Sequence, residues 1–197
     1  MTTTTRPRTT TRPRTTAEIL TSSESTDWWT PDPYISACRE MLGTKDDLMG
    51  IDLDPASCLR ANTELVRAKQ FYEPPQNGLE LPWFGKVFLN PPYSKTRGVS
   101  NQLLWTQKLF REFAAGNVTE AILLTNVSTS TKWFAPLWEH SSCWVDHRIN
   151  FVRPEGGKSS STHDNVFFYL GKRTPRFAQF FVQFGPVVLP HGVYRRK

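Results

Sequence analysis

The segment Asn90-Pro91-Pro92-Tyr93 combines residue types that can hold a planar ring carrying an amino group. It directly follows residues 86–89, an apolar run that predicts a buried strand. The two prolines fix a rigid, extended exit from that strand, so Asn90 and Tyr93 are held with little conformational freedom. The Asn90 side-chain oxygen and the Pro91 carbonyl can accept hydrogen bonds from an exocyclic amine, and Tyr93 can stack on the ring.

A second candidate site lies upstream, where Asp52 and Asp54 fall at the end of a short predicted strand, residues 48–53. A carboxylate in that position can accept both hydroxyls of a nucleoside cofactor's ribose, as in dinucleotide-binding folds. Asp54 also precedes Pro55, a pair typical of a helix start. The sequence alone is therefore equally consistent with Asp54 as a helix cap.

Helix and strand signals alternate along the chain from residue 30 onward. Cap residues, prolines and apolar residues at helical spacing predict helices at 31–42, 55–68, 101–115 and 132–139. Thr30, directly before Pro31, is the predicted N-cap of the first of these helices. Apolar runs predict strands at 48–53, 86–89, 121–124, 144–151 and 166–170, and a Phe-rich segment makes a further candidate strand at 177–184. The alternation predicts an α/β fold with a mostly parallel central sheet flanked by helices. Ligands bind such sheets beyond the carboxyl ends of the strands, where both polar clusters fall.

The sequence resembles the S-adenosylmethionine-dependent amino methyltransferases, whose (Asn/Asp)-Pro-Pro-(Tyr/Phe) motif matches residues 90–93. Within that superfamily it is most similar to the phage-type DNA adenine N6-methyltransferases. Four further elements follow the order of that group: Asp-Trp-Trp-Thr-Pro at 27–31, Leu-Asp-Pro-Ala at 53–56, Trp-Phe-Gly at 83–85 and Thr-Ser-Thr-Lys-Trp-Phe at 129–134. The resemblance implies one Rossmann-like methyltransferase domain, which we place at residues 17–190.

The resemblance also implies an activity, the transfer of a methyl group from S-adenosylmethionine to the N6 amine of adenine in double-stranded DNA. The target adenine would be extruded from the duplex into a pocket. Asn90 and the Pro91 carbonyl would accept hydrogen bonds from its amine, Pro92 would complete the rigid turn, and Tyr93 would stack on the base. Neither a metal nor a covalent intermediate is expected, because catalysis by such a site is mainly positioning and electrostatics.

The same resemblance implies residues for the cofactor. Trp29, Thr30 and Pro31 would border it. Asp52 has the spacing of the general methyltransferase ribose ligand, and Asp54 matches the acidic position of the phage group. The sequence departs from typical methyltransferases at one point, since no glycine-rich loop of the Phe-x-Gly-x-Gly type precedes Asp52. The cofactor loop is therefore unassigned by sequence.

Charge is distributed unevenly along the 197 residues. Residues 1–16 repeat Thr-Thr-Thr-Arg-Pro-Arg and contain four arginines and no acid, and residues 195–197 add three cations. The residues between them hold 17 of the 24 cations and all 18 acids, which excludes a uniformly cationic, histone-like surface. We expect residues 1–16 to be a disordered tail, either a passive linker or an arm on DNA phosphates, and residues 191–197 to be a basic C-terminal tail.

Cations inside the domain are candidate phosphate contacts, although solvated loops carry such residues too. Two of them directly follow the tetrapeptide and three lie near the C-terminal end of the domain: Lys95, Arg97, Lys172, Arg173 and Arg176.

The composition also argues against disulfide-rich, zinc-binding, membrane-spanning and secreted proteins. The three cysteines are widely spaced and odd in number, which predicts reduced thiols rather than a disulfide framework or a zinc site. The sequence lacks an apolar run long enough to cross a bilayer and an apolar signal segment at its start, so we expect a cytoplasmic protein, in the bacterial host if it is phage-encoded.

Two alternative functions remain open from the sequence. The same tetrapeptide serves methyltransferases that act on cytosine N4, on RNA or on protein glutamine. The missing glycine loop is also compatible with a catalytically silent methyltransferase fold that only binds DNA. The basic ends of the chain favour nucleic acid over a protein glutamine.

We expect deletion of residues 1–16 to weaken DNA binding and to flatten its salt dependence, because the four arginines would no longer displace counterions from phosphates. Methyl transfer at saturating DNA should not change, since the deleted segment contains none of the candidate site residues. Binding measured over a series of salt concentrations checks this, and an unchanged slope would make the repeat a passive linker.

Overall fold

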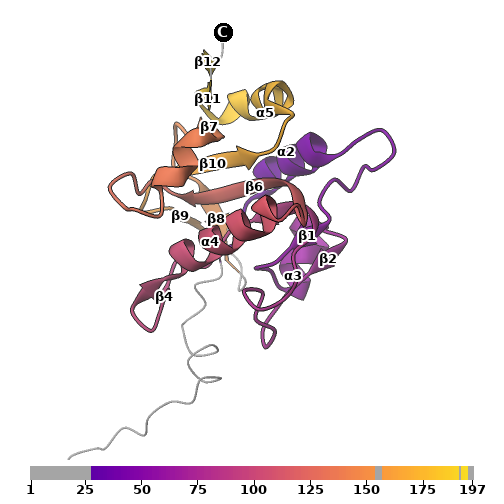
Figure 1. Ribbon diagram of the computed structural model, residues 1–197, viewed down its shortest axis with the longest axis vertical. Coiled ribbons are helices and arrows are strands. Elements are labelled where there is room, and N and C mark those ends of the chain that lie inside the picture. Colours follow the sequence, from indigo (N-terminus) through magenta and orange to yellow (C-terminus); the bar gives the residue numbers. More distant parts are fainter. Residues whose placement is uncertain (1–27, 154–156, 191, 195–197) are drawn as a thin grey trace, which may run out of the picture.

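The computed structural model describes residues 28–153, 157–190 and 192–194; the predicted N-terminal tail lies outside them. An eight-stranded sheet runs through the molecule in the order β12-β11-β7-β10-β6-β3-β1-β2, with helices on both of its faces (Figure 1). The sheet strands are β1 Leu53–Asp54, β2 Gln70–Phe71, β3 Gly85–Leu89, β6 Val118–Asn126, β7 Ser141–Trp144, β10 Asn165–Leu170, β11 Val187–Leu189 and β12 Gly192–Tyr194. The helices are α2 Asp32–Leu42, α3 Leu59–Ala61, α4 Asn101–Ala114 and α5 Thr174–Phe181, with the short turns η1 Asn62–Val66, η2 Ala135–Glu139 and η3 Val182–Phe184.

Strand direction divides the sheet into two halves. Strands β2, β1, β3 and β6 are mutually parallel, and β6 then pairs antiparallel with β10. Strands β7, β11 and β12 continue the antiparallel half, so the sheet extends into residues 192–194 of the expected C-terminal tail. The α/β, Rossmann-like architecture is confirmed, and both polar clusters belong to its parallel half.

Two small hairpins are inserted at the same edge of this sheet. The first, β4 Lys95–Thr96 with β5 Val99–Ser100, follows the carboxyl end of β3. The second, β8 Asn150–Val152 with β9 Lys158–Ser160, lies between β7 and β10. Because β10 runs antiparallel to β6, the connection from β7 to β10 is on the side where the parallel strands end. Both hairpins therefore stand at the carboxyl edge.

The sheet separates two apolar cores, because successive residues of a strand face opposite sides. In β6, Ile122 and Leu124 belong to the core under α2 and α5, whereas Ala121 and Leu123 belong to the core under α4. All four side chains are fully buried. Figure 1 shows the resulting three layers, with α4 on one face of the sheet and α2 with α5 on the other.

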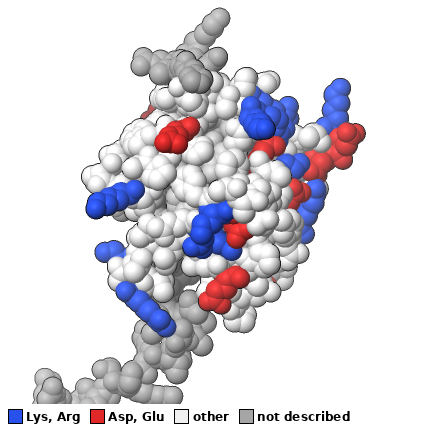
Figure 2. Space-filling view, in the orientation of Figure 1, with Lys and Arg blue, Asp and Glu red and all other residues white. Residues whose placement is uncertain are grey.

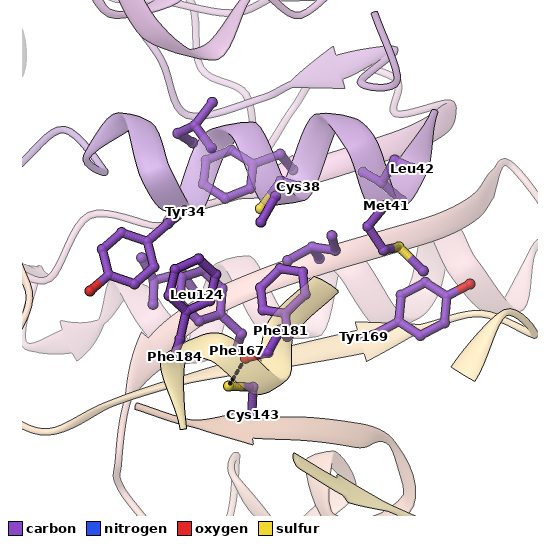
Figure 3. Packing of buried hydrophobic residues seen from close by; sticks show 14 of the residues in the cluster. Tyr34, Cys38, Met41, Leu42, Leu124, Cys143, Phe167, Tyr169, Phe181 and Phe184 are labelled. Atoms are coloured by element: carbon purple, nitrogen blue, oxygen red, sulfur yellow. Dashed lines mark hydrogen bonds between the residues drawn. The ribbon is translucent and has the colours of Figure 1, made fainter. Parts of the chain in front are cut away.

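The Phe-rich segment at 177–184 is helix α5 followed by the turn η3, so its prediction as a strand was wrong. Phe177, Phe181 and Phe184 recur at intervals of four and three, which places them on one helical face. That face packs into the α2 core, where the rings of Phe177 and Phe181 stack with centroids 4.4 Å apart. The Cys143 thiol donates to the Phe181 carbonyl at 3.3 Å within the same core (Figure 3).

Four other predicted elements differ from the structure. The strand expected at 48–53 is reduced to the two-residue β1, Leu53–Asp54, and Gly50 within the expected strand has φ +70°, which is not strand geometry. The helix expected from residue 55 starts only at Leu59 and continues as the π-helical turn η1. The strand expected at 144–151 is divided between β7 and β8, and the helix expected at 132–139 is the short 3-10 turn η2. Helix α2 begins at Asp32 as predicted to within one residue, but its cap position is Pro31 rather than Thr30.

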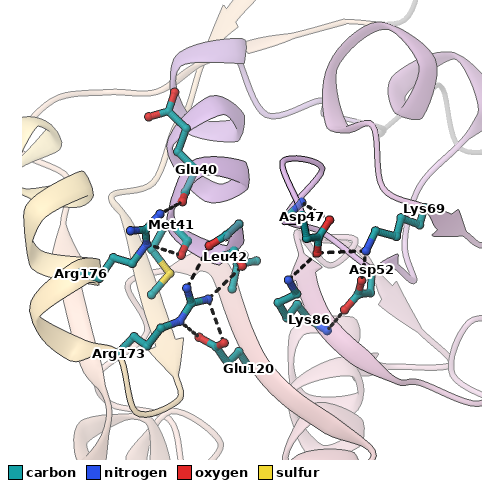
Figure 4. Close-up of polar contacts among 12 residues, drawn as sticks. Glu40, Met41, Leu42, Asp47, Asp52, Lys69, Lys86, Glu120, Arg173 and Arg176 are labelled. Carbon is teal, nitrogen blue, oxygen red and sulfur yellow. Dashed lines mark hydrogen bonds and ion pairs between the residues drawn. The ribbon is translucent and has the colours of Figure 1, made fainter. Parts of the chain in front are cut away.

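Two arginines of α5 and its N-terminal flank cap the last turn of α2 (Figure 4). Arg173 donates to the carbonyls of Gly43 at 3.1 Å and Leu42 at 2.9 Å, and its Nε donates to Glu120 at 2.9 Å. Arg176 donates to two further carbonyls of the same turn. Carbonyls at a helix C-terminus lack intrahelical partners, so these guanidinium groups satisfy them and favour the helix dipole.

We expect Arg173→Ala to lower the free energy of unfolding by about 2 kcal/mol, since it leaves two helix carbonyls and Glu120 without their charged donor. The free energy of unfolding of Arg173→Lys should lie between those of the wild type and Arg173→Ala. An ammonium group keeps the charge but, unlike the planar guanidinium group, cannot reach both carbonyls and the carboxylate at once. Urea denaturation of the three proteins measures this; equal midpoints would show that the cap is energetically neutral.

Candidate active site

A single pocket brings the two polar clusters together at the carboxyl ends of β1 and β3. Its lining includes Trp29, Thr30, Asp54, Asn90, Pro91, Pro92 and Tyr93. Of the nine residues assigned from sequence to catalysis and to the cofactor, the pocket gathers these seven, and it does not include Pro31 or Asp52. The parallel pairing of β1 with β3 places the strand ends side by side, which explains the convergence.

The side-chain amide of Asn90 is held by three neighbours. Its Nδ2 donates to the Trp28 carbonyl at 3.0 Å and to the Thr30 hydroxyl at 3.2 Å. Its Oδ1 accepts a hydrogen bond from the Tyr93 hydroxyl at 2.8 Å. A backbone carbonyl can only accept, so the Trp28 contact fixes the nitrogen on that side and leaves the oxygen as the amide's acceptor.

Thr30 can accept a hydrogen bond from Asn90 because its side chain does not cap helix α2. The sequence predicts Thr30 as the helix cap, but Pro31 occupies that position and no side chain caps the helix. The Thr30 hydroxyl is therefore available to accept from Asn90, and the residue is only 4% exposed.

The remaining atoms of the tetrapeptide are suited to an amine-bearing ring. Burial raises the pKa of the Tyr93 hydroxyl, so it remains protonated and keeps donating to Asn90. Within the described part of the chain nothing donates to the Pro91 carbonyl, which leaves that oxygen as an acceptor. The Asn90 oxygen has a second lone pair beside the one that Tyr93 engages. Two acceptors and an aromatic ring thus belong to residues that line one pocket.

Asp54 is buried in the pocket wall and does not cap a helix. Its carboxylate accepts from the Ala56 backbone N–H at 3.2 Å, and its residue exposure is 3%. Burial raises the pKa of Asp54 to about 6. The Ala56 N–H and the Ser57 side chain partly offset this effect. Two carboxylate oxygens can accept about four hydrogen bonds, so Asp54 retains unused acceptor capacity, which suits a ligand that presents hydroxyl groups.

Asp52 faces away from the pocket and joins β1 to β3 at their other ends. Its two oxygens accept from the Lys69 ammonium and from the Lys86 backbone N–H, both at 2.8 Å (Figure 4). Asp47 bridges the same two lysines, which lowers the pKa of Asp47 to about 2. The Trp-Phe-Gly element serves this packing: Gly85 has φ +64°, and a Cβ there would lie 2.5 Å from an Asp52 oxygen.

The cations predicted to contact DNA fall into two groups. Lys95 and Arg97 are exposed on the first hairpin, directly after Tyr93. Arg173 caps α2 beside Glu120, near the start of β6 and hence at the opposite edge of the sheet. Its neighbours Lys172 and Arg176 lie at that edge too, so the structure does not bring these three together with the pocket.

The first hairpin is preorganised. Its turn consists of Arg97 and Gly98, whose φ values of 50° and 81° match the type I′ geometry that suits two-residue hairpins. The buried side chain of Asn101 closes it by accepting from the Thr96 hydroxyl at 2.8 Å and donating to the Ser94 hydroxyl at 3.0 Å. Over this hairpin, at the lower left of Figure 2, Lys and Arg side chains stand out with no Asp or Glu among them.

Sequence reasoning missed several contributors to the pocket. The Trp28 carbonyl acts through the backbone, which no side-chain pattern reveals. Cys58 and Phe88 line the pocket as well, but their residue types are equally typical of a core. The strand alternation of β3 could have identified Phe88, since it lies two positions before Asn90 on the same side of the strand.

Two other kinds of feature are absent from the described residues. No group of three or more His, Cys, Asp or Glu side chains there could hold a metal ion. No helix in the described residues has the length and apolar character needed to cross a membrane.

Comparison with known proteins relates the chain to one group. A family model described as DNA N-6-adenine-methyltransferase (Dam) matches residues 17–174. A DNA N-6-adenine-methyltransferase of Haemophilus phage HP1 (strain HP1c1) is 26% identical over 144 residues, which cover 71% of this chain and 72% of the relative. The matched region contains every pocket residue named above.

Asp54 should make the stability of the ligand-free protein depend on pH. Its pKa in the folded state, about 6, is above the ordinary value of about 4, so the folded state favours the protonated carboxyl. The contribution of Asp54 to the free energy of unfolding is therefore fully present below pH 4 and is lost as pH rises through 6. Asp54→Asn removes this titration. Between pH 4 and pH 7 we expect the free energy of unfolding of the variant to rise by about 2 kcal/mol relative to that of the wild type, measured by urea unfolding. Parallel stability profiles would contradict a buried, titrating carboxylate.

Proposed function

The chain belongs to the DNA N-6-adenine-methyltransferase family, and from that premise we propose how its pocket carries out the reaction. The enzyme methylates adenine in DNA at N6. We propose that the adenine is extruded from double-stranded DNA into the pocket and that S-adenosylmethionine is the methyl donor. The observation that carries this proposal is the Asn90 amide, held with its oxygen toward a pocket that Asp54 also lines.

On the substrate side, Asn90 Oδ1 and the Pro91 carbonyl accept hydrogen bonds from the two N–H groups of the adenine amine. These bonds orient the nitrogen lone pair out of the plane of the amine and raise its electron density. Tyr93 stacks on the base. Thr30 and the Trp28 carbonyl hold the Asn90 nitrogen, so the amide cannot turn its NH₂ group toward the adenine amine. In that orientation the N–H donors of the two groups would repel each other.

On the cofactor side, Asp54 accepts hydrogen bonds from the ribose hydroxyls, and Trp29 and Thr30 border the ligand. The fit rests on the donor set: Asp54 is a buried carboxylate with one backbone N–H donor at 3.2 Å, and hydroxyl groups supply what it lacks. When bound, S-adenosylmethionine supplies an electrophilic methyl group on a positively charged sulfur. We assign this role to Asp54 rather than Asp52, because Lys69 and the Lys86 backbone already engage both oxygens of Asp52.

On the DNA side, Lys95 and Arg97 contact phosphates next to the extruded adenine. The support for this is position, since the hairpin that carries them emerges from Tyr93 and is closed by Asn101. The proposal does not extend to Arg173 and Arg176, whose guanidinium groups are occupied by carbonyls of α2.

The proposal is tested by incubating the protein with tritiated S-adenosylmethionine and unmethylated duplex DNA, and then digesting the DNA to nucleosides. We expect the label in N6-methyladenine. Asn90→Ala should reduce the rate by at least about 100-fold, the usual cost of removing one transition-state hydrogen-bond partner. Cofactor affinity, measured by calorimetry, should change little.

Tyr93→Phe is the matched control, because it keeps the stacking face and removes only the hydroxyl that contacts Asn90. It should retain most of the activity. Label in cytosine or protein alone would overturn the substrate assignment. No transfer, together with no cofactor binding, would identify a silent methyltransferase fold.

A further inference from the structure

The β8–β9 hairpin packs against three residues that line the pocket, Trp28, Trp29 and Tyr93. Trp29 and Val152 exchange two backbone hydrogen bonds of 3.0 Å, so the hairpin is joined directly to the segment that holds Asn90. Phe151 lies 4% exposed between Trp28 and Tyr93, with ring centroids 6.4 Å and 6.3 Å away in edge-on contact. The hairpin therefore touches both the aromatic ring that stacks on the adenine and the residue whose carbonyl orients the catalytic amide.

Arg153 directly follows strand β8 and stacks on Trp28, one of the residues that line the pocket. Its guanidinium carbon lies 5.1 Å from the centre of the Trp28 ring, while the residue remains exposed to solvent. Stacking on an indole fixes a guanidinium group by its face and leaves the N–H donors at its edge for another partner. Trp28 lines the pocket, so the Arg153 guanidinium group lies one side chain away from it.

Two other arginines in this region are paired with carboxylates. Arg60 stacks on Trp29 at 5.2 Å but pairs with Glu64 at 2.7 Å. Arg148 pairs with Asp164 at 3.0 Å. Among the described residues no acidic side chain pairs with Arg153. A planar guanidinium group stacked on a residue of a base-binding pocket has the chemistry of a phosphate ligand, since its edge matches two phosphate oxygens.

We infer that Arg153 binds the DNA phosphodiester next to the extruded adenosine and so holds that nucleotide in its extruded position. This inference rests on the proposed function and adds a contact on the opposite hairpin from Lys95 and Arg97. The two hairpins then contact the strand on either side of the pocket. Phosphate binding of this kind positions the DNA and carries no sequence information by itself.

The test compares Arg153→Ala and Arg153→Lys with Arg111→Ala, which removes an exposed arginine at the end of α4, far from the carboxyl edge. The DNA is a duplex that the wild-type protein methylates. Arg153→Ala should weaken DNA binding about tenfold and reduce the salt slope of log K by about 1, the value for one phosphate contact. Arg153→Lys should keep the slope and lose part of the affinity, and Arg111→Ala should match the wild type.

Two further readouts make the result decisive. S-adenosylmethionine affinity and the urea midpoint of Arg153→Ala should equal those of the wild type, which excludes misfolding as the cause. An unchanged salt slope for Arg153→Ala, or a lower kcat with unchanged DNA affinity, would overturn the inference while leaving the proposed function intact. Failure of the wild-type protein to methylate any duplex would instead overturn the proposed function.

Discussion

The orientation of one side-chain amide governs the chemistry of this pocket. An asparagine amide can face a ligand with its oxygen or with its nitrogen, and only the oxygen can accept hydrogen bonds from an amine. In Asn90 the choice is made by the Trp28 carbonyl, an obligate acceptor that takes the nitrogen at 3.0 Å. Thr30 and Tyr93 add contacts that agree with the same orientation. The site is thus preorganised before any substrate enters it.

The rest of the fold keeps that carbonyl in place. The segment that contains Trp28 is held from one side by backbone pairing of Trp29 with Val152 and from the other by the start of α2. Helix α2 is anchored at its far end, where Arg173 satisfies its last carbonyls. The carboxyl edge of the sheet consequently holds the pocket, and the amino edge holds the contacts that fix the helix beside it.

How much the sequence could predict depended on the range of the interaction. The tetrapeptide and its position at a strand end were predictable, because prolines and apolar runs act locally. The contacts of Arg173 with the end of α2 could not be predicted, since these partners are about 130 positions away and no local pattern identifies them. Thr30 and Asp54 both resembled helix caps, and only the three-dimensional arrangement shows that their oxygens serve the pocket instead.

Charge illustrates the same distinction between composition and arrangement. Inside the domain cations and acids almost balance, and several of them cancel in pairs such as Lys86 with Asp47 and Arg173 with Glu120. Lys95, Arg97 and Arg153 have no acidic partner among the described residues, and all three stand on the hairpins of the carboxyl edge. A DNA phosphate responds to the charge within about one Debye length, roughly 10 Å, rather than to the total for the chain. A nearly neutral domain can therefore present a cationic rim to DNA at the one edge where its pocket opens.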